Sequence, residues 1–391
     1  MSVTVPTVRK GKQPVRGPAA PGPGHRPRKQ GHGRPGVYLL LLLALAAAFG
    51  VYRMAIVRTP AGRIVAHFSN AKVMLANESG FIIRSKETDA LVFSDGSILK
   101  FNEEFERYVV AGPWIVGSRP SRMTLFPADG RHAIPVSTNL HPAERHIPVT
   151  GGDIAVTFRP GSGLKFGEVW WLRGFSAQGN VLWESKVSYA PYIAACNANI
   201  LAVGAVDISA GGIPWVICLS RDTGTVLWQR KLEQGFWRNL ALYPAGEISA
   251  ILDGGVYLMA SDGSPLWVYR PEGNVVSAGV SSDVTAIAFL RDLAEPVSKV
   301  LGSSAISVIA RDGKASWTRV SRDLCPRIYT SEETLVVLES RRVTGYQLAD
   351  GYRFFSTIAS GYPKAYAKGV ILVEKDCDIT LVDIGISGPA R

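Results

Sequence analysis

A glycine followed four residues later by a tryptophan recurs through the second half of this 391-residue chain. The pairs are Gly179 and Trp183, Gly224 and Trp228, Gly263 and Trp267, and Gly313 and Trp317. The frame continues with Gly351 and Phe355, and backward with Gly130 and Ile134, and an aspartate precedes most of these glycines. Asp-Gly supplies the positive φ of a tight hairpin turn, and the bulky residue then falls within the next strand. Such self-similarity predicts a solenoid or a propeller.

The segments between the turns are short and rich in branched and aromatic residues, which is typical of strands. One set directly precedes the turns, at residues 215–219, 256–259, 305–309 and 343–348. A second set lies one step earlier, at 200–203, 247–252, 284–289 and 334–338. Each unit therefore has at least three strands in meander order. Its length of roughly 40 to 50 residues fits a four-stranded propeller blade.

A propeller must join its last blade to its first. Residues 370–373 and 379–383 form two expected strands with no third strand after them, whereas 64–68 have the pattern of a post-turn strand with no blade before them. We therefore expect 64–68 to complete the last blade beside 379–383, which leaves no free edge. The fold class is all-β: a propeller over 62–384 with seven or eight four-stranded blades. A count of the turn glycines from Gly62 onward favours eight blades. Seven is the alternative, because Lys100 stands where a tryptophan would follow Gly96.

The head of the chain predicts a membrane anchor. Residues 1–35 carry eight cations, many prolines and no acid, so we expect a disordered basic cytoplasmic tail. Residues 36–57 are predominantly apolar and predict one transmembrane signal-anchor helix. The cations before it place the N-terminus in the cytoplasm and the propeller outside, on the cell membrane. A cleaved signal peptide is the alternative, because Ala46 to Ala48 before Phe49 fit a cleavage site.

The charge of the chain is unevenly placed. Its 43 Lys and Arg residues exceed its 32 Asp and Glu residues by 11, and eleven of the cations lie at or before Arg63. The propeller is therefore nearly neutral, and no nucleic-acid partner is expected. Residues 385–391 are expected to form a short C-terminal tail. The sequence gives no indication of the oligomeric state.

The segment from Asp222 to Trp228 resembles the repeat of quinoprotein-type β-propellers, the PQQ-like repeat. Gly179 to Trp183 and Ser261 to Trp267 are similar, and the resemblance covers about residues 160–360. It implies a propeller with tryptophans stacked between the blades. The relatives it implies include quinone-dependent dehydrogenases and non-catalytic scaffolds of outer-membrane assembly, so the resemblance does not by itself imply an enzyme.

Catalytic chemistry has little support in the residues. The dehydrogenases resemble one another in an adjacent cysteine pair, whereas the cysteines here are far apart, at Cys196, Cys218, Cys325 and Cys377. We expect Cys218 to be a buried thiol, although two disulfides remain conceivable. His132, His141 and His146 match no ligand spacing. We therefore predict no catalytic residue, no cofactor and no metal site, and we interpret the aspartates before the glycines as turn formers.

Two tryptophans outside the repeat are candidate partner contacts. Trp170 and Trp171 are adjacent, so they must point to opposite faces of one strand, and Trp171 is the candidate. Trp237 lies in a link between blades, and exposed aromatic residues anchor interfaces. The sequence favours a non-enzymatic scaffold that binds membrane or envelope proteins near the bilayer. A quinone-dependent dehydrogenase and a sensor of small ligands or glycans at the propeller mouth are the alternatives.

Overall fold

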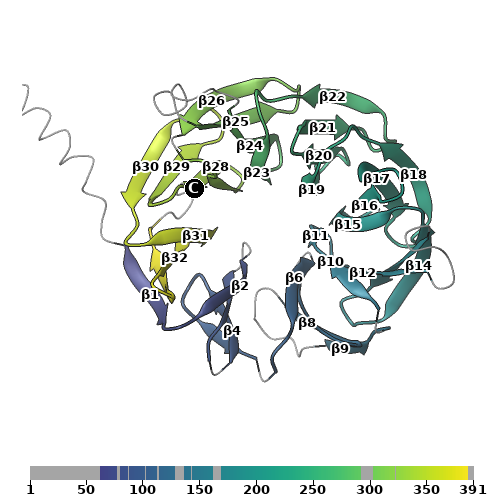
Figure 1. Ribbon diagram of the computed structural model, residues 1–391, viewed down its shortest axis with the longest axis horizontal. Helices are drawn as coiled ribbons and strands as arrows, with labels where there is room; N and C mark the ends of the chain where they lie inside the picture. The colour runs from purple at the N-terminus through teal and green to yellow at the C-terminus, as the bar shows by residue number, and fades with distance from the viewer. Residues whose placement is uncertain are drawn as a thin grey trace, which may run out of the picture. The chain divides into compact units, whose positions relative to one another are not determined.

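Figure 1 shows a computed structural model of the chain. The structure describes residues 62–385 except 77–79, 87, 102, 112–113, 128–135, 142, 162–168, 292–302 and 322. The expected tail 1–35, the expected anchor 36–57 and all but Gly385 of the tail 385–391 lie outside the described residues. Within the described part, no helix is long and apolar enough to span a bilayer.

The described secondary structure is entirely β, as expected. The chain forms antiparallel meanders that each begin at the centre of a ring and step outward (Figure 1). The first four meanders are β2 (Lys72–Ala76), β3 (Gly80–Arg84), β4 (Asp89–Phe93) and β5 (Ile98–Lys100); β6 (Arg107–Ala111), β7 (Trp114–Arg119), β8 (Arg122–Pro127) and β9 (Val136–Asn139); β10 (Arg145–Ile147), β12 (Ala155–Pro160), β13 (Trp170–Phe175) and β14 (Val181–Val187); and β15 (Ala190–Cys196), β16 (Ile200–Asp207), β17 (Ile213–Ser220) and β18 (Val226–Lys231).

The next four meanders repeat the same path. Its meanders are β19 (Trp237–Leu242), β20 (Ile248–Leu252), β21 (Gly255–Met259) and β22 (Pro265–Tyr269); β23 (Val275–Val280), β24 (Val284–Leu290), β25 (Ser304–Ala310) and β26 (Ala315–Ser321); β27 (Arg327–Thr330), β28 (Thr334–Leu338), β29 (Arg342–Gln347) and β30 (Arg353–Ile358); and β31 (Tyr362–Ala367), β32 (Val370–Lys375) and β33 (Asp378–Asp383), which β1 (Arg63–Phe68) completes. Every strand that the sequence predicts in these four meanders is present.

The number of separate blades differs from the seven or eight expected, because six four-stranded sheets stand alone. The seventh sheet has nine strands, in the order β18-β17-β16-β15-β11-β6-β7-β8-β9. The short strand β11 (Val149–Thr150) causes this difference, since it pairs in parallel with both β6 and β15. It thereby joins two meanders, β6 to β9 and β15 to β18, that the turn pattern counts separately. The sequence gives no signal for such a bridging strand.

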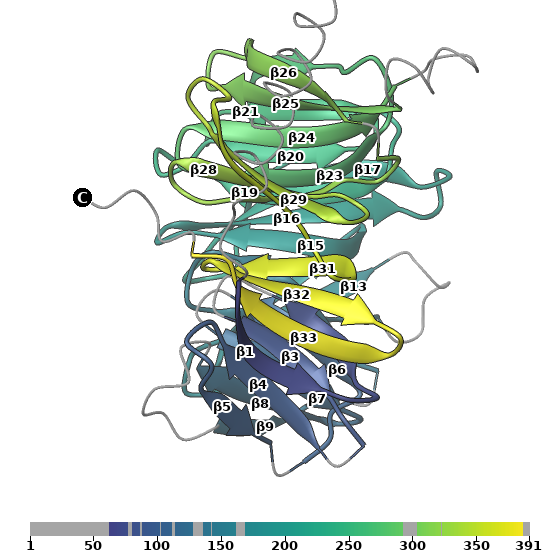
Figure 2. The ribbon, with the colours of Figure 1, turned by 90° about the vertical axis from the view of Figure 1, so that its left-hand side faces the viewer.

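The ring closes as the sequence predicts. Strand β1 pairs antiparallel with β33, with Ile64 opposite Val382 and Phe68 opposite Ile379. Figure 2 shows this sheet, in which strands from the two ends of the chain lie side by side. Strand β31 of the same sheet contacts β2 of the next. With β1 in place, this sheet has four strands, like the sheets on either side of it. The pairing of β1 with β33 confirms the prediction.

The innermost strands run in one direction, so the two faces of the ring differ. Ile328 N donates to Ser277 Oγ at 3.1 Å, and Thr330 Oγ1 donates to Val280 O at 3.1 Å. The residue numbers rise together in these two pairs, so β23 and β27 are parallel, as β6 and β15 are through β11. We call the face at which the innermost strands begin face A, and the opposite face, face B.

Tryptophan latches hold successive blades together from β14 onward. We call the meanders β2 to β9 the first half of the propeller and those from β10 onward the second half. Each indole nitrogen donates to a backbone carbonyl of the next blade: Trp183 to Arg221 at 2.7 Å, Trp228 to Ser261 at 2.7 Å, Trp267 to Arg311 at 2.7 Å and Trp317 to Leu348 at 2.8 Å. Each ring also packs against the turn glycine of that blade; a Cβ on Gly224 would stand 2.6 Å from Trp183. This geometry confirms the stacking that the repeat implied.

The aspartates before the glycines shape the turns. Asp262 Oδ1 accepts the amide hydrogen of Ser264 at 2.8 Å, and Asp350 Oδ1 accepts that of Tyr352 at 2.7 Å. These contacts to the backbone two residues on are typical of Asx turns. The turn-forming interpretation is therefore confirmed for both residues.

Candidate functional site

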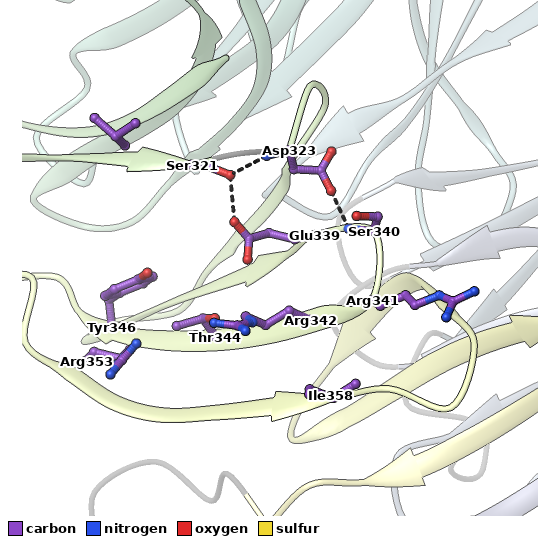
Figure 3. Close-up of a pocket in the computed structure, with 11 residues that line it drawn as sticks. Ser321, Asp323, Glu339, Ser340, Arg341, Arg342, Thr344, Tyr346, Arg353 and Ile358 are labelled. Carbon is purple, nitrogen blue, oxygen red and sulfur yellow. Dashed lines mark hydrogen bonds between the residues drawn. The ribbon is translucent and has the colours of Figure 1, made fainter. Parts of the chain in front are cut away.

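A groove of about 670 Å³ lies between two neighbouring blades of the second half. The last strand of one blade, β26, forms one wall, and β29, β30 and the turn from β28 to β29 form the other (Figure 3). The residues that line it are Val320, Ser321, Asp323, Glu339, Ser340, Arg341, Arg342, Thr344, Tyr346, Arg353 and Ile358. We call this site the blade groove. Its end at Val320, Arg342 and Ile358 lies at face A, because Arg342 pairs with Ile358 at the start of β29.

The two acids of the blade groove are occupied in building its wall. Ser321 Oγ donates to Glu339 Oε1 at 2.6 Å and accepts the amide hydrogen of Asp323 at 3.1 Å. The Asp323 carboxylate in turn accepts the amide hydrogens of Cys325, at 3.0 Å, and of Ser340. Figure 3 shows this chain of contacts from β26 to the β28–β29 turn. These carboxylates therefore fix the backbone rather than face a ligand.

The cations of the blade groove are exposed and unpaired. Arg341, Arg342 and Arg353 are all exposed, and among the described residues no carboxylate lies within ion-pair distance of them. The Arg341 guanidinium instead lies over the ring of Tyr362, 5.7 Å from its centroid. Burial, and then the nearby Glu339, raise the pKa of Tyr346 at the floor, so its phenol stays neutral and can donate a hydrogen bond.

Apolar side chains flank these arginines. Val320 is 55% exposed and Ile358 is 72% exposed. The blade groove thus offers guanidinium donors beside exposed aliphatic surface, a combination that suits binding. Sequence reasoning missed this site. The only signal was the consecutive pair Arg341-Arg342 in a turn between two strands, which has no distinguishing spacing.

The two tryptophans chosen from the sequence differ in placement. Trp237 is only 7% exposed, and its indole nitrogen donates to Ala205 O at 3.1 Å. This burial gives Trp237 a packing role and speaks against a direct partner contact, whereas the preceding Phe236 is 75% exposed. Trp170 is buried and Trp171 only partly so, on opposite faces of β13 as expected. Neither tryptophan lines the blade groove.

Trp171 lies between two cations. The Arg159 guanidinium is 5.6 Å and the Lys186 ammonium 4.8 Å from its ring centroid. Both cations come from strands beside β13, so the ring is part of a cluster of β12, β13 and β14. Trp171 is only partly buried, and its contact with a partner stays a prediction.

The histidines and cysteines do not converge. His146 is buried, and burial followed by the charges of Arg107 and Arg145 lowers its pKa to about 4. His141 is exposed, and His132 lies outside the described residues.

Cys218 is fully buried, as expected, and burial raises the pKa of both Cys196 and Cys218 to about 12. All four cysteines are free, and no metal-binding cluster of His, Cys, Asp or Glu occurs in the described part of the chain.

Comparison with known families relates the second half to one repeat. The family model described as outer membrane protein assembly factor BamB matches residues 170–321 and 214–357. These matches span the strands from β13 to β30 and include all four tryptophan latches. No sequence match was found among curated proteins.

Solved structures share the fold at low sequence identity. Sqt1 from Saccharomyces cerevisiae aligns over 83% of this chain and 99% of its own, with 11% identity and a TM-score of 0.55. BamB from Moraxella catarrhalis aligns over 82% of this chain and 99% of its own, with 13% identity and a TM-score of 0.51. The computationally designed protein Ika8 aligns over 84% of this chain and 98% of its own, with 11% identity and a TM-score of 0.56. The chain is therefore similar in fold to these proteins, and residues 170–357 carry PQQ-like repeats.

Proposed function

We propose that this chain is a membrane-anchored, extracytoplasmic propeller that binds envelope proteins near the bilayer and holds them for assembly, without a reaction of its own. The observation that carries the proposal is the blade groove, where Arg341 and Arg342, which have no ion-pair partner among the described residues, stand beside exposed aliphatic side chains at face A. Arginine and large apolar residues are the side chains that anchor protein interfaces. The match to a family described as an assembly factor supports the same function.

The rigidity of the ring suits a scaffold. Four latches and the closing pair of β1 and β33 tie the blades together. A ring without an open edge presents its faces in a fixed geometry, so little ordering entropy opposes the binding of a partner. The exposed groove residues lie on strand ends and on one tight turn, which hold their backbone in place.

Anchoring is the second part of the proposal. It rests on the apolar segment 36–57 and on the basic residues before it. Few residues separate that segment from Arg63, where the closing strand begins, so an anchored propeller would have limited reach from the bilayer. Full-length protein should remain in the membrane fraction after carbonate washing, with its N-terminus intact. Recovery of a soluble form that begins at Phe49 would contradict the anchor and support cleavage.

A photo-crosslinking residue at Ile358 tests partner binding directly. Introduced there in the full-length chain, it should yield a discrete adduct with an envelope protein in living cells. The matched control is Leu266, which is 51% exposed but lies at the opposite end of its blade, at face B. Equal adducts at the two positions, or none at either, would contradict binding at the blade groove.

A second measurement separates the scaffold from the dehydrogenase. Purified full-length protein, supplied with quinone cofactor, calcium and a panel of alcohols and sugars, should reduce an electron acceptor no faster than a blank. A cofactor-dependent rate would overturn the proposed function, whatever the crosslinking result.

A further inference from the structure

Every charged side chain on the innermost strands of the ring, apart from histidine, is a cation. These strands, β2, β6, β10, β11, β15, β19, β23, β27 and β31, contain six Lys and Arg residues and no Asp or Glu. The six are Lys72, Arg107, Arg145, Arg238, Arg327 and Lys364. Residues 64–391 as a whole carry equal numbers of cations and acids, so the remainder of the propeller is net acidic and the positive charge is concentrated toward the centre. The strands lie nearest the middle of the ring in Figure 1.

The cations stand near the beginning of their strands and therefore toward face A. Four of them, Lys72, Arg107, Arg145 and Arg327, are the first residue of a strand. Arg238 and Lys364 follow shortly after, each at a β-bulge. A bulge leaves one residue out of the ladder and redirects its side chain. The recurrence of the same irregularity in separate blades places these cations at corresponding positions of the ring.

Three of the cations share one cavity of about 460 Å³. Lys72 on β2, Arg327 on β27 and Lys364 on β31 line it, together with Tyr329 and Glu374. Arg327 Nη1 donates to the carbonyl oxygen of Lys364 at 2.6 Å, which holds the guanidinium at the wall. We call this site the channel cavity. Three neighbouring blades build it, so it exists only in the closed ring.

The charge of the channel cavity is not balanced within it. Glu374 is the one carboxylate among its lining residues, and it pairs with Lys364 at 3.2 Å. Within the described residues, no carboxylate lies in ion-pair distance of Lys72 or Arg327. Charges of one sign that line a concave surface focus the electric field there, so the cations of this cavity should attract an anion. Arg327 adds a fixed donor array that suits a carboxylate.

Exposed aromatic and aliphatic side chains surround the channel at face A. They are Phe236 at 75% exposure, Leu324 at 64%, Tyr192 at 60% and Tyr362 at 52%. Each precedes or begins an innermost strand, or lies at its bulge. A small inorganic anion would leave this apolar rim unused. A peptide chain that carries both carboxylates and apolar side chains would contact the rim and the cations together.

We propose that face A captures an acidic peptide segment of a partner protein, whose carboxylates enter the channel cavity between Lys72 and Arg327 while its apolar side chains pack on the rim. The inference rests on the proposed function, because it names the chemistry of the partner that the scaffold holds. It places the primary contact at the centre of the ring, with the blade groove as a second contact on the same face.

Fluorescence anisotropy with full-length protein in detergent tests the capture. The probe is a labelled peptide of about twelve residues that alternates Glu and Asp with Phe. Lys72→Glu combined with Arg327→Glu should weaken binding by about tenfold or more. The matched control is Lys368→Glu, since Lys368 is exposed in the β31–β32 turn at face B, and this variant should bind within about twofold of the parent. Melting curves identify a variant that has not folded, and the milder Lys72→Gln and Arg327→Gln variants then replace it.

Four outcomes would overturn the capture of an acidic segment. Equal binding of a peptide with Gln in place of Glu and Asn in place of Asp would show that charge is not recognised. An equal loss in Lys368→Glu would show only general attraction to a cationic surface. Displacement of the peptide by millimolar phosphate at constant ionic strength would assign the cavity to a small anion. If Ile358 crosslinks equally well in parent and in the Lys72→Glu, Arg327→Glu variant, the scaffold stands and this inference fails.

Discussion

The two halves of the propeller join their blades by different chemistry. In the second half, one indole and one glycine make each joint, and the same latch recurs after β14, β18, β22 and β26. In the first half, Lys100 ends the short outer strand β5 and no tryptophan latch forms there. The joint between β4 and β6 is instead made from a buried ion pair and an aromatic cluster. The difference shows that the fold requires a filled joint, and that its chemistry can vary.

The ion pair of the first half centres on Asp89, which is fully buried. Arg84 donates to both of its oxygens, from Nε and Nη2, at 2.6 Å each, and Tyr108 on β6 donates its hydroxyl at 2.6 Å. Burial tends to raise the pKa of Asp89, but the hydrogen bonds from Arg84 and Tyr108 outweigh it and lower the pKa. The carboxylate is thus charged and links β3 and β4 to the neighbouring β6.

Aromatic rings complete that joint. Phe101 lies 4.5 Å from Phe126 between ring centroids, and Phe105 lies 5.6 Å from Tyr108 in an edge-on arrangement. These side chains come from the link after β5 and from two different strands, so they fill the joint in the absence of a latch. Their spacing follows no repeat. Each contact is specific to this one joint, whereas a latch aimed at a backbone carbonyl works in any blade.

The largest expected effect tests whether the ion pair is indispensable. Asp89→Asn should lower the free energy of unfolding by about 3 to 5 kcal/mol, because it leaves the Arg84 charge without its counter-ion in a buried joint. Chemical denaturation of the detergent-solubilised chain measures the loss. The double variant Arg84→Met, Asp89→Leu should recover most of it, because both charges are then absent. A single variant as stable as the parent would mean that solvent reaches the pair and that the aromatic cluster alone holds the joint.

A pH-dependent effect of intermediate size concerns the boundary between the two halves. His146 on β10 contacts Met123 of the first half, with Nε2 3.2 Å from Sδ. Its pKa falls from 6.5 to about 4 on folding, so the unfolded chain binds a proton that the native chain does not. Stability should therefore drop as the pH falls from 6.5 through about 4, by about 3 kcal/mol in total. Above pH 6.5 this contribution is fully retained.

The variant His146→Gln isolates that contribution. It cannot gain the proton, so its unfolding free energy should change less between pH 7 and pH 4.5 than that of the parent. The titration of Asp89 affects stability mainly below this pH range, since the pKa of its carboxyl is 3.8 in the unfolded chain and lower in the folded one. Parallel pH profiles for parent and variant would show that His146 becomes protonated without unfolding.

The sequence predicts the latched half well and the other half poorly, for physical reasons. Trp183, Trp228 and Trp267 repeat in register because each performs the same local task, so periodicity reveals them. Asp89 and Phe101 act through partners that are close only after folding, and nothing in their spacing marks them. The same limit applies to the candidate sites: Lys72, Arg327 and Lys364 meet because three separate blades begin at one face. The bridging strand β11 is also a product of tertiary contact, since two residues carry no periodic signal.

The smallest expected effect tests whether the glycine is as necessary to a latch as the indole. Gly224 has φ +67, and a Cβ there would stand 2.6 Å from Trp183; Gly211 has φ +79 and nothing within 4 Å of such a Cβ. Gly211→Ala therefore measures the backbone strain alone, about 1 kcal/mol. Gly224→Ala should cost a further 1 to 3 kcal/mol or so, because the methyl group displaces the ring. Thermal and denaturant unfolding give both values. A Cβ on Gly224 would also stand 2.6 Å from Ser185 Oγ, so the extra cost should vanish in a Trp183→Ala, Ser185→Ala background, where both close neighbours are gone. If it persists, the close approach of Trp183 is not what selects glycine, and the two halves of the ring differ less than their contacts indicate.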